Sequence, residues 1–194
     1  MLGKEGIKKE LNRGIYVDDA KNKLGENYIL VTLGDSLKVY DESISILDVK
    51  KENKTKTLHI PEEGLMIEAN RLYLGRTNEY TKTKGYVPLL AGLDELAALG
   101  IEIHITAGFG DNGFEGTWTL EISSTCPTIL YPNMPIGKIY YHPLIGDPSI
   151  EYKGKYFGQV DETASRINTE YTKKLVRGKN NVNKWWDKKA NRKK

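Results

Sequence analysis

We predict a mainly β fold for this chain, a sandwich or a barrel, because short runs of alternating apolar and polar residues recur along most of its length. Turn-forming pairs separate these runs, namely Gly34-Asp35, Pro61-Glu62, Asn112-Gly113 and Pro132-Asn133. Up to residue 160, helical spacing of apolar residues occurs only in one N-terminal and one internal segment. Many short strands at close spacing are typical of all-β architectures.

The N-terminal segment, residues 3–13, predicts a short amphipathic helix. Ile7 and Leu11 lie four residues apart on one face, and Gly14 is a plausible stop. Strand-like runs follow to the end of the β region. They read IYVDD, ENYILVTLGDSLKVYD, TLHI, GLMIEA, RLYLGRTNEY, IEIHITA, TWTLEI, TILYP and GKIYYHPL.

Two segments interrupt the succession of strands. Residues 48–58 are polar and rich in lysine, so we expect an exposed connection there. Residues 90–101, LAGLDELAALGI, contain good helix formers and predict a second short helix, ended by Gly100.

The 194 residues suit one domain, although two small domains would also fit this length. The alternation weakens after residue 150, where YKGKYFGQV is typical of a loop or lid. We therefore assign residues 1–160 to a β domain and residues 161–194 to a lid and basic tail. Within the latter, residues 163–190 are expected to be partly helical or disordered.

Basic residues are concentrated at the C-terminal end. Residues 172–194 contain ten lysines and arginines with Asp187 as the only acid, and the remaining body is acidic. The body therefore offers no broad surface for nucleic acid. We expect the tail to be solvated, or to contact phosphates or an acidic surface, and Trp185-Trp186 is a candidate docking element for a protein partner.

The compartment is predicted from cysteine usage and hydropathy. Cys126 is the single cysteine, so no internal disulfide can form, and we expect it to be a small core residue. No apolar run approaches the ~20 residues that span a bilayer, and MLGKEGIKKEL lacks the apolar core of a signal peptide. We expect a soluble protein in the reducing cytoplasm of a bacterium or a virus-infected cell.

Several catalytic classes lack their motif in this sequence. There is no Walker loop, dinucleotide fingerprint or G-x-S-x-G elbow. A zinc deaminase needs a His/Cys/Cys set around the metal. One cysteine and three dispersed histidines, His59, His104 and His142, do not supply it, so we expect no zinc.

The most informative segment is GLDELAALGIEIHITAGFGDNGFEGTWTLEI, residues 92–122. It combines a helix-like piece, a strand, a turn rich in glycine and aspartate, and a second strand. Alternation along the second strand places Trp118, Leu120 and Ile122 on one face, and Thr117, Thr119 and Glu121 on the other. By position alone, Glu121 is either an ordinary solvent-facing carboxylate or a catalytic one.

Three blocks in order resemble the dCTP deaminase family. They are ENYILVTLGDSLKVYD, LYLGRTNEYTKTKGYVPLLAG and IHITAGFGDNGFEGTWTLEI, and the resemblance extends over residues 2–160. It implies a distorted β-barrel or jelly roll of the dUTPase-like type, a homotrimer, and active sites between subunits closed by the C-terminal segment. It also implies zinc-independent deamination of dCTP to dUTP, with Mg²⁺ accompanying the triphosphate.

The resemblance assigns roles to individual residues. Glu121 matches the general base, which takes a proton from water and passes it to the cytosine ring. Asp111 matches the aspartate that holds the deoxyribose hydroxyl, Ala107 the backbone carbonyl near the water, and Phe114 an apolar position near the sugar. The residues that match the lid contacts to phosphate and base are Lys155, Tyr156 and Gln159.

The phosphate-binding motif departs from the family pattern. The family has Gly-Arg-Ser-Ser and a second arginine shortly after, whereas this chain has Gly92 followed by Leu93, Asp94 and Glu95, with Ala98 at the second arginine. Each lost charge-assisted contact costs about 1.5–3 kcal/mol. The two carboxylates would also repel the phosphates unless Mg²⁺ bridges them.

Three hypotheses about function follow. The chain is a working or altered deaminase of deoxycytidine nucleotides, in which Asp94 and Glu95 recruit metal or accept a less charged substrate. Alternatively, it is a catalytically silent trimeric homologue that binds nucleotides or regulates an active partner. In the third hypothesis, the fold serves as a structural or interaction protein whose tail docks a partner.

Overall fold

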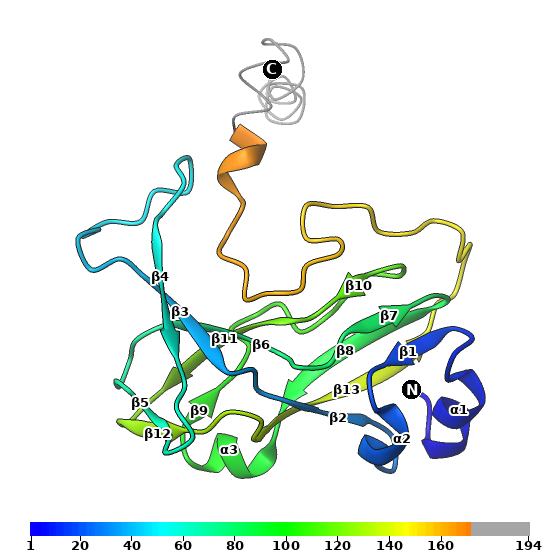
Figure 1. Ribbon diagram of the computed structural model, residues 1–194. Helices are drawn as coiled ribbons and strands as arrows, with labels where there is room; N and C mark the ends of the chain where they lie inside the picture. Colours follow the sequence, from blue (N-terminus) through cyan, green and yellow to red (C-terminus); the bar gives the residue numbers. More distant parts are fainter. Residues whose placement is uncertain (172–194) are drawn as a thin grey trace, which may run out of the picture. The chain divides into compact units, whose positions relative to one another are not determined.

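Short strands dominate the computed structural model, which describes residues 1–171 (Figure 1). The helices are α1 (Lys4–Glu10), α2 (Ala20–Lys23) and α3 (Asp94–Ala98). The strands are β1 (Ile15–Val17), β2 (Ile29–Thr32), β3 (Ser36–Tyr40), β4 (Thr55–His59), β5 (Leu65–Ile67), β6 (Tyr73–Arg76), β7 (Thr81–Thr83), β8 (Tyr86–Gly92), β9 (Ile101–Glu102), β10 (Glu115–Gly116), β11 (Thr119–Ser124), β12 (Thr128–Leu130) and β13 (Pro135–Pro143). The mainly β class predicted from the sequence is confirmed.

The strands form small antiparallel sheets. One has the order β4-β3-β6-β11-β9 and a second the order β2-β13-β8. Two more have the orders β1-β7-β10 and β12-β5. Strands distant in sequence are neighbours in every sheet, so the fold depends on pairings that no local sequence window contains.

The chain divides into two units. The first comprises residues 1–39 and 55–164, and contains the buried core. Among the described residues, the second comprises residues 40–54 and 165–171. In the second unit, Asp41 N–H donates to the Lys54 carbonyl (3.0 Å), and Asn53 accepts from Asp48 N–H (3.1 Å).

Alternating burial explains the strands of the first unit. β2 and β3 bury every second residue, and so does β11, where Leu120 and Ile122 are fully buried. The other large side chains that are fully buried come from α1, from several strands and from the connections next to them. They include Ile7, Ile15, Ile29, Leu33, Leu37, Ile60, Ile67, Leu90, Leu130 and Tyr141. The polar sides of β11 are thus free to form a site.

Both predicted helices exist, with shorter bounds. The first ends at Glu10, before the predicted limit at residue 13. The internal helix is restricted to α3, because residues 90–92 belong to β8 and pair with residues 137–139 of β13. Backbone pairing along β13 therefore outweighs the helix propensity of these residues. Gly100 does follow the helix end, with a φ of +78°.

Other local predictions were wrong in whole or in part. The connection predicted over residues 48–58 is confirmed for residues 48–54 only, because β4 already begins at Thr55. Residues 103–107, predicted as strand, are irregular, because only Ile101 and Glu102 pair with β11. Cys126 is exposed in a turn and does not belong to the core. β7, β8 and α2 were not predicted, because lysines or a proline interrupt the alternation of apolar and polar residues in them.

The segment after β13 has little regular structure, as expected of a loop or lid. Residues 168–171 are helical, and the rest of the region predicted as partly helical lies outside the described residues, as does Trp185-Trp186. None of the helices in residues 1–171 is long and apolar enough to cross a membrane.

Candidate functional site

Glu121 lies in the middle of β11, where it pairs with Leu74 of β6. Its side chain is 29% exposed and points to the polar side of the strand, opposite the buried Leu120 and Ile122. Thr119 shares this side and is also partly exposed. Thr117 was predicted on the same face but is buried, because β11 begins only at Thr119.

His104 contacts Glu121, a pairing that the sequence analysis missed. Its Nδ1 lies 2.6 Å from Oε2 of Glu121, and its side chain is 11% exposed. The Nε2 atom is buried and has no hydrogen-bond partner among the described residues. The two residues are 17 positions apart, so no local spacing rule connects them. The signal available was the position of His104 directly before Ile105-Thr106-Ala107 in the third resembling block.

Aromatic rings support this pair from the interior. Trp118 lies edge-on to the His104 ring, with centroids 6.5 Å apart, and Phe114 packs against Trp118 at 5.4 Å. The Trp118 indole N–H donates to the Thr81 hydroxyl (3.0 Å), which satisfies its only polar atom. The His104 ring therefore packs against a fixed neighbour.

The C-terminal segment lies beside the chain that enters β11. The main-chain carbonyl oxygen of Gln159 accepts from Thr117 N–H (2.9 Å). The side-chain Nε2 of Gln159 donates to the main-chain carbonyl of Thr117 (2.9 Å) and to the Thr119 hydroxyl (3.2 Å). Its Oε1 is buried and has no partner among residues 1–171. Glu121 is the next residue after Thr119 on the same face, so Gln159 contacts the neighbour of Glu121 on this face of β11.

Gly116 allows this close approach. Its φ is +144°, which L side chains rarely adopt, and a Cβ at this position would lie 2.6 Å from the Gln159 carbonyl oxygen. Glycine is therefore required both by its own backbone conformation and by the neighbouring segment.

A buried carboxylate anchors the next part of the segment. Glu162 is almost fully buried, and its carbonyl oxygen accepts from the Lys38 ammonium at 2.8 Å. Its carboxylate lies 3.4 Å from the Ser36 hydroxyl and 3.9 Å from Nε of Arg76. These contacts connect the segment to β3 and β6, which belong to the same sheet as β11.

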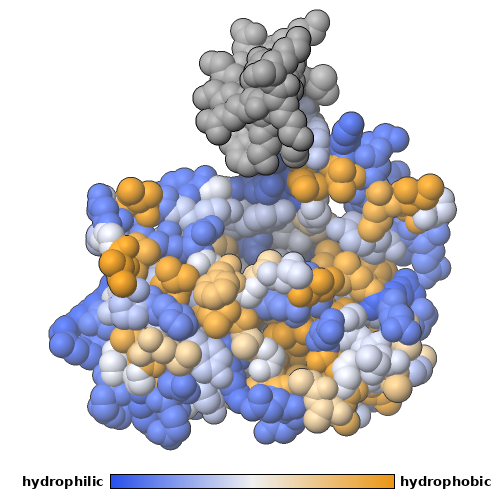
Figure 2. Space-filling model, turned by 180° about the vertical axis from the view of Figure 1, so that it is seen from behind, coloured by the Kyte–Doolittle hydropathy of each residue, from blue (hydrophilic) through white to orange (hydrophobic). Residues whose placement is uncertain are grey.

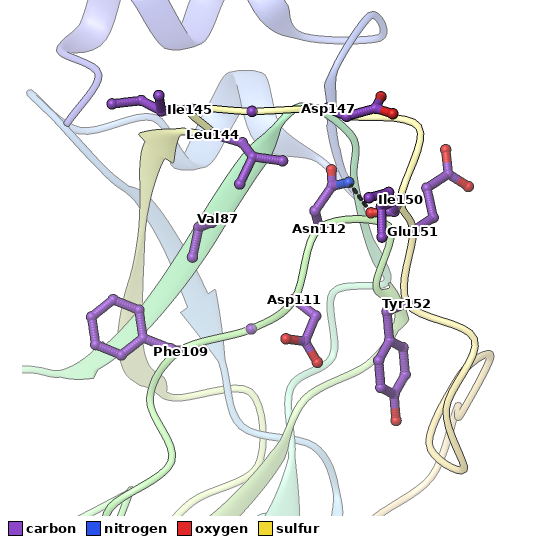
Figure 3. A pocket seen from close by; sticks show the side chains of 12 residues that line it. Val87, Phe109, Asp111, Asn112, Leu144, Ile145, Asp147, Ile150, Glu151 and Tyr152 are labelled. Carbon is purple, nitrogen blue, oxygen red and sulfur yellow. Dashed lines mark hydrogen bonds between the residues drawn. The ribbon is translucent and has the colours of Figure 1, made fainter.

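Asp111 lies in a pocket of about 630 Å³ next to the Asn112-Gly113 turn (Figure 3). Asn112 holds the walls together, because its side-chain amide donates to the carbonyls of Pro148 (3.0 Å) and Ile150 (2.8 Å). Tyr152 contributes to the same wall, and its ring packs against Phe114 with centroids 6.2 Å apart. Glu121 does not line this pocket, so the two predicted residues have separate surroundings within one chain.

The remaining predicted residues lie in irregular segments. Ala107 is exposed before the Leu89–Phe109 bridge. Tyr156 N–H donates to the Tyr152 hydroxyl (3.1 Å), and Nζ of Lys155 lies 5.6 Å from the centroid of the Tyr156 ring. Lys155 and Tyr156 therefore belong to the loop that also carries Gln159.

The altered motif lies at the start of α3. Leu93 is partly buried against the core, whereas the Asp94 side chain is 92% exposed. Nζ of Lys138 lies 3.2 Å from Oδ2 of Asp94, and this hydrogen bond raises the pKa of Lys138 above its usual value. Glu95 and Ala98 are exposed. Within residues 1–171, neither Asp94 nor Glu95 hydrogen-bonds Glu121.

Comparison with known proteins places these features in context. The profile of the dCTP deaminase-like family matches residues 1–144. A dCTP deaminase, dUMP-forming, of Hathewaya histolytica is 48% identical over 157 residues, which cover 80% of this chain and 90% of the relative. A protein of the same name from Leptospira biflexa is 44% identical over 176 residues, which cover 90% of this chain and 99% of the relative.

A solved structure shares the fold. It is the 2′-deoxycytidine 5′-triphosphate deaminase of Agrobacterium tumefaciens, with a TM-score of 0.56 at 12% identity. The match covers 74% of this chain and about half (48%) of that longer chain. At this identity the likeness concerns the fold alone, and it supports the dUTPase-like type predicted from the sequence.

Proposed function

The chain belongs to the dCTP deaminase-like family, and on that premise we propose that it deaminates a deoxycytidine nucleotide with Glu121 as the general base. The observation that carries this proposal is the setting of Glu121. One carboxylate oxygen is held by His104 at 2.6 Å, and the side chain is still 29% exposed. A general base needs both a fixed position and access to its proton donor.

The reaction proposed is hydrolytic. A water oxygen bonds to the ring carbon that carries the amino group, Glu121 takes a proton from that water and passes it on, and ammonia leaves. Gln159, in the segment beside β11, and Asp111, in the separate pocket described above, are proposed to contact base and sugar. Ala107, Phe114, Lys155 and Tyr156 are proposed to complete the nucleotide contacts. No zinc takes part in this proposal, and Mg²⁺ enters only with the nucleotide.

The phosphate end differs from the family pattern. Leu93, Asp94, Glu95 and Ala98 replace two arginines and two serines, and Asp94 is paired with Lys138. We propose that triphosphate affinity is weak, because apolar residues replace the two arginines of the family motif and carboxylates replace its two serines. We expected dUTP as the product from the resemblance, whereas the names of the relatives specify dUMP, so both products belong to the test.

The same substitutions favour a second candidate function. With its phosphate motif lost, the chain would be a catalytically silent homologue that binds nucleotides, regulates a partner, or serves in assembly. Its support is the pair of exposed carboxylates at Asp94 and Glu95. The retained setting of Glu121 favours the enzyme, which we therefore keep as the first proposal.

Assembly as a homotrimer in the cytoplasm is part of the proposal. Large apolar side chains lie on the surface of the first unit, and Figure 2 shows apolar areas among hydrophilic ones on one face. The exposed large apolar side chains of this unit include Met66, Leu99, Phe109, Ile129 and Ile145. Subunit contacts would cover such surface. Cys126 is exposed and unpaired, which suits a reducing compartment.

A direct measurement of nucleotide binding distinguishes the two nucleotide-based functions from a purely structural role. Titration calorimetry of the full chain with dCTP and with dUTP, each with and without Mg²⁺, should give measurable heat for dCTP. Binding followed by release of uracil nucleotide supports the enzyme, and binding without turnover supports the silent homologue. If neither nucleotide produces heat at millimolar concentration, both nucleotide-based functions are wrong.

A further inference from the structure

The donor and the acceptor in the hydrogen bond between His104 and Glu121 can be assigned. An ionised carboxylate only accepts hydrogen bonds, so the proton in the 2.6 Å contact belongs to Nδ1 of His104. In a neutral imidazole the proton is then on Nδ1, and Nε2 carries a lone pair. This assignment makes His104 the donor and Glu121 the acceptor.

The burial of the second ring nitrogen agrees with a neutral ring. Nε2 of His104 is buried without a partner among the described residues. A doubly protonated ring would leave a buried N–H donor, and part of a positive charge, without an acceptor there. A lone pair on a neutral nitrogen is the less costly state. The structure therefore favours a neutral donor beside Glu121 rather than an ion pair.

The ring has little freedom to leave this position. Ile103 precedes it in the core and Trp118 packs edge-on against it, with the indole fixed by Thr81. Glu121 itself is held along β11 by pairing with Leu74. The two partners thus come from separate, well-supported parts of the first unit.

We propose that His104 is the positioning residue of the general base. Its Nδ1–H holds Oε2 of Glu121 and leaves Oε1 as the oxygen that receives the proton from water. This proposal rests on the proposed function, because it assigns a role at the same site. Without His104, the carboxylate would rotate about its last torsion angles and present either oxygen, or neither, to the water.

Activity measurements test the role in catalysis. His104→Leu removes the donor, and we expect kcat to fall on the order of 100-fold while KM for dCTP changes by less than threefold. His104→Asn places an amide N–H near the position of Nδ1, so it should recover at least one tenth of the wild-type kcat. The matched control is His142→Asn on β13, which should leave kcat unchanged.

Nitrogen NMR of the ring tests the contact without turnover. The chain has three histidines, His59, His104 and His142, so ¹⁵N signals can be assigned by single substitutions. We expect His104 in the Nδ1–H tautomer at neutral pH, and we expect Glu121→Ala to shift its signals but not those of the other two. Because this measurement does not need the His104→Leu variant, it tests the contact even if that variant fails to fold.

The outcomes separate the two proposals. Wild-type kcat in His104→Leu, no recovery in a folded His104→Asn, or an Nε2–H or doubly protonated His104 would overturn the positioning role. If the wild-type chain shows no turnover, the proposed enzyme fails, and the NMR result alone decides whether His104 holds Glu121.

Discussion

The Tyr80 hydroxyl lies 2.8 Å from a carboxylate oxygen of Glu115, which also pairs with Lys82 at 3.0 Å. Burial, followed by the hydrogen bond and the charge of Glu115, raises the pKa of Tyr80 to about 12. The folded state therefore keeps the phenol proton at a pH where the unfolded state has released it. Stability from this group is complete below the ordinary value of 10.0 and is lost as pH rises toward 12.

The raised pKa of Tyr80 gives a prediction for stability at alkaline pH. The melting temperature of the wild type should fall between pH 10 and 12 more steeply than that of Tyr80→Phe, which has no phenol to ionise at this position. Thermal unfolding followed by circular dichroism across this range measures the difference. Parallel curves for the two proteins would show that Tyr80 titrates normally.

Individual site residues differed in how far the sequence could place them. Glu121 was predicted on the polar side of a strand, and β11 has that alternation because Leu120 and Ile122 must be buried. His104 could not be paired with it, since the contact crosses an irregular segment whose path depends on the packing of Trp118. Alternation predicts the face of a strand but not the loop that approaches it.

At the scale of elements, the loop that carries Lys155, Tyr156 and Gln159 (the Gln159 segment) can approach the chain that enters β11 only because residue 116 is a glycine. Gly116→Ala would place a Cβ 2.6 Å from the Gln159 carbonyl oxygen and strain the backbone at a φ of +144°. We expect the segment to be displaced, with a rise in KM for dCTP of about tenfold or more, and a loss of about 1–3 kcal/mol in unfolding free energy. Steady-state kinetics and urea unfolding measure the two effects.

Gly85→Ala is the matched control for this substitution. Gly85 also has a positive φ, +76°, but a Cβ there would meet nothing within 4 Å. It should therefore lose stability through backbone strain and keep the wild-type KM. An equal rise in KM in both variants would contradict a specific role for the Gln159 segment.

The altered motif allows a test by restoration. Replacing Leu93 and Ala98 by arginine, and Asp94 and Glu95 by serine, rebuilds the family pattern at the start of α3. Each recovered charge-assisted contact contributes about 1.5–3 kcal/mol, so dCTP affinity should rise at least tenfold. Calorimetry should show no such gain for deoxycytidine, which lacks phosphates. A gain shared by the nucleoside would mean that the motif acts on the base or sugar.

Elements were predictable where local pattern and pairing agree. β2, β3 and β11 alternate clearly and were anticipated. Residues 90–92 were not, because their helix propensity is overridden by pairing with β13. β7 is short and contains Lys82 on its exposed side, so its sequence does not differ from that of a loop. In both segments, pairing with strands far apart in the chain determines the strand conformation.

At the scale of the whole molecule, we predict a homotrimer that does not need the basic end. Deleting residues 180–194 should leave the trimer intact in sedimentation velocity, because the family profile ends at residue 144. The deletion should weaken any complex with an acidic partner, since it removes most of the basic charge of the tail. Dissociation into monomers would instead make the tail part of the assembly.

Conversion of dCTP by the full chain tests the central claim most directly. We predict that the wild type and the control Glu102→Gln, an exposed residue on β9, release uracil nucleotide, and that Glu121→Gln lowers the rate by about 10²–10⁴-fold without loss of folding. Chromatography of the products distinguishes dUMP from dUTP. Wild-type turnover in Glu121→Gln would contradict the account.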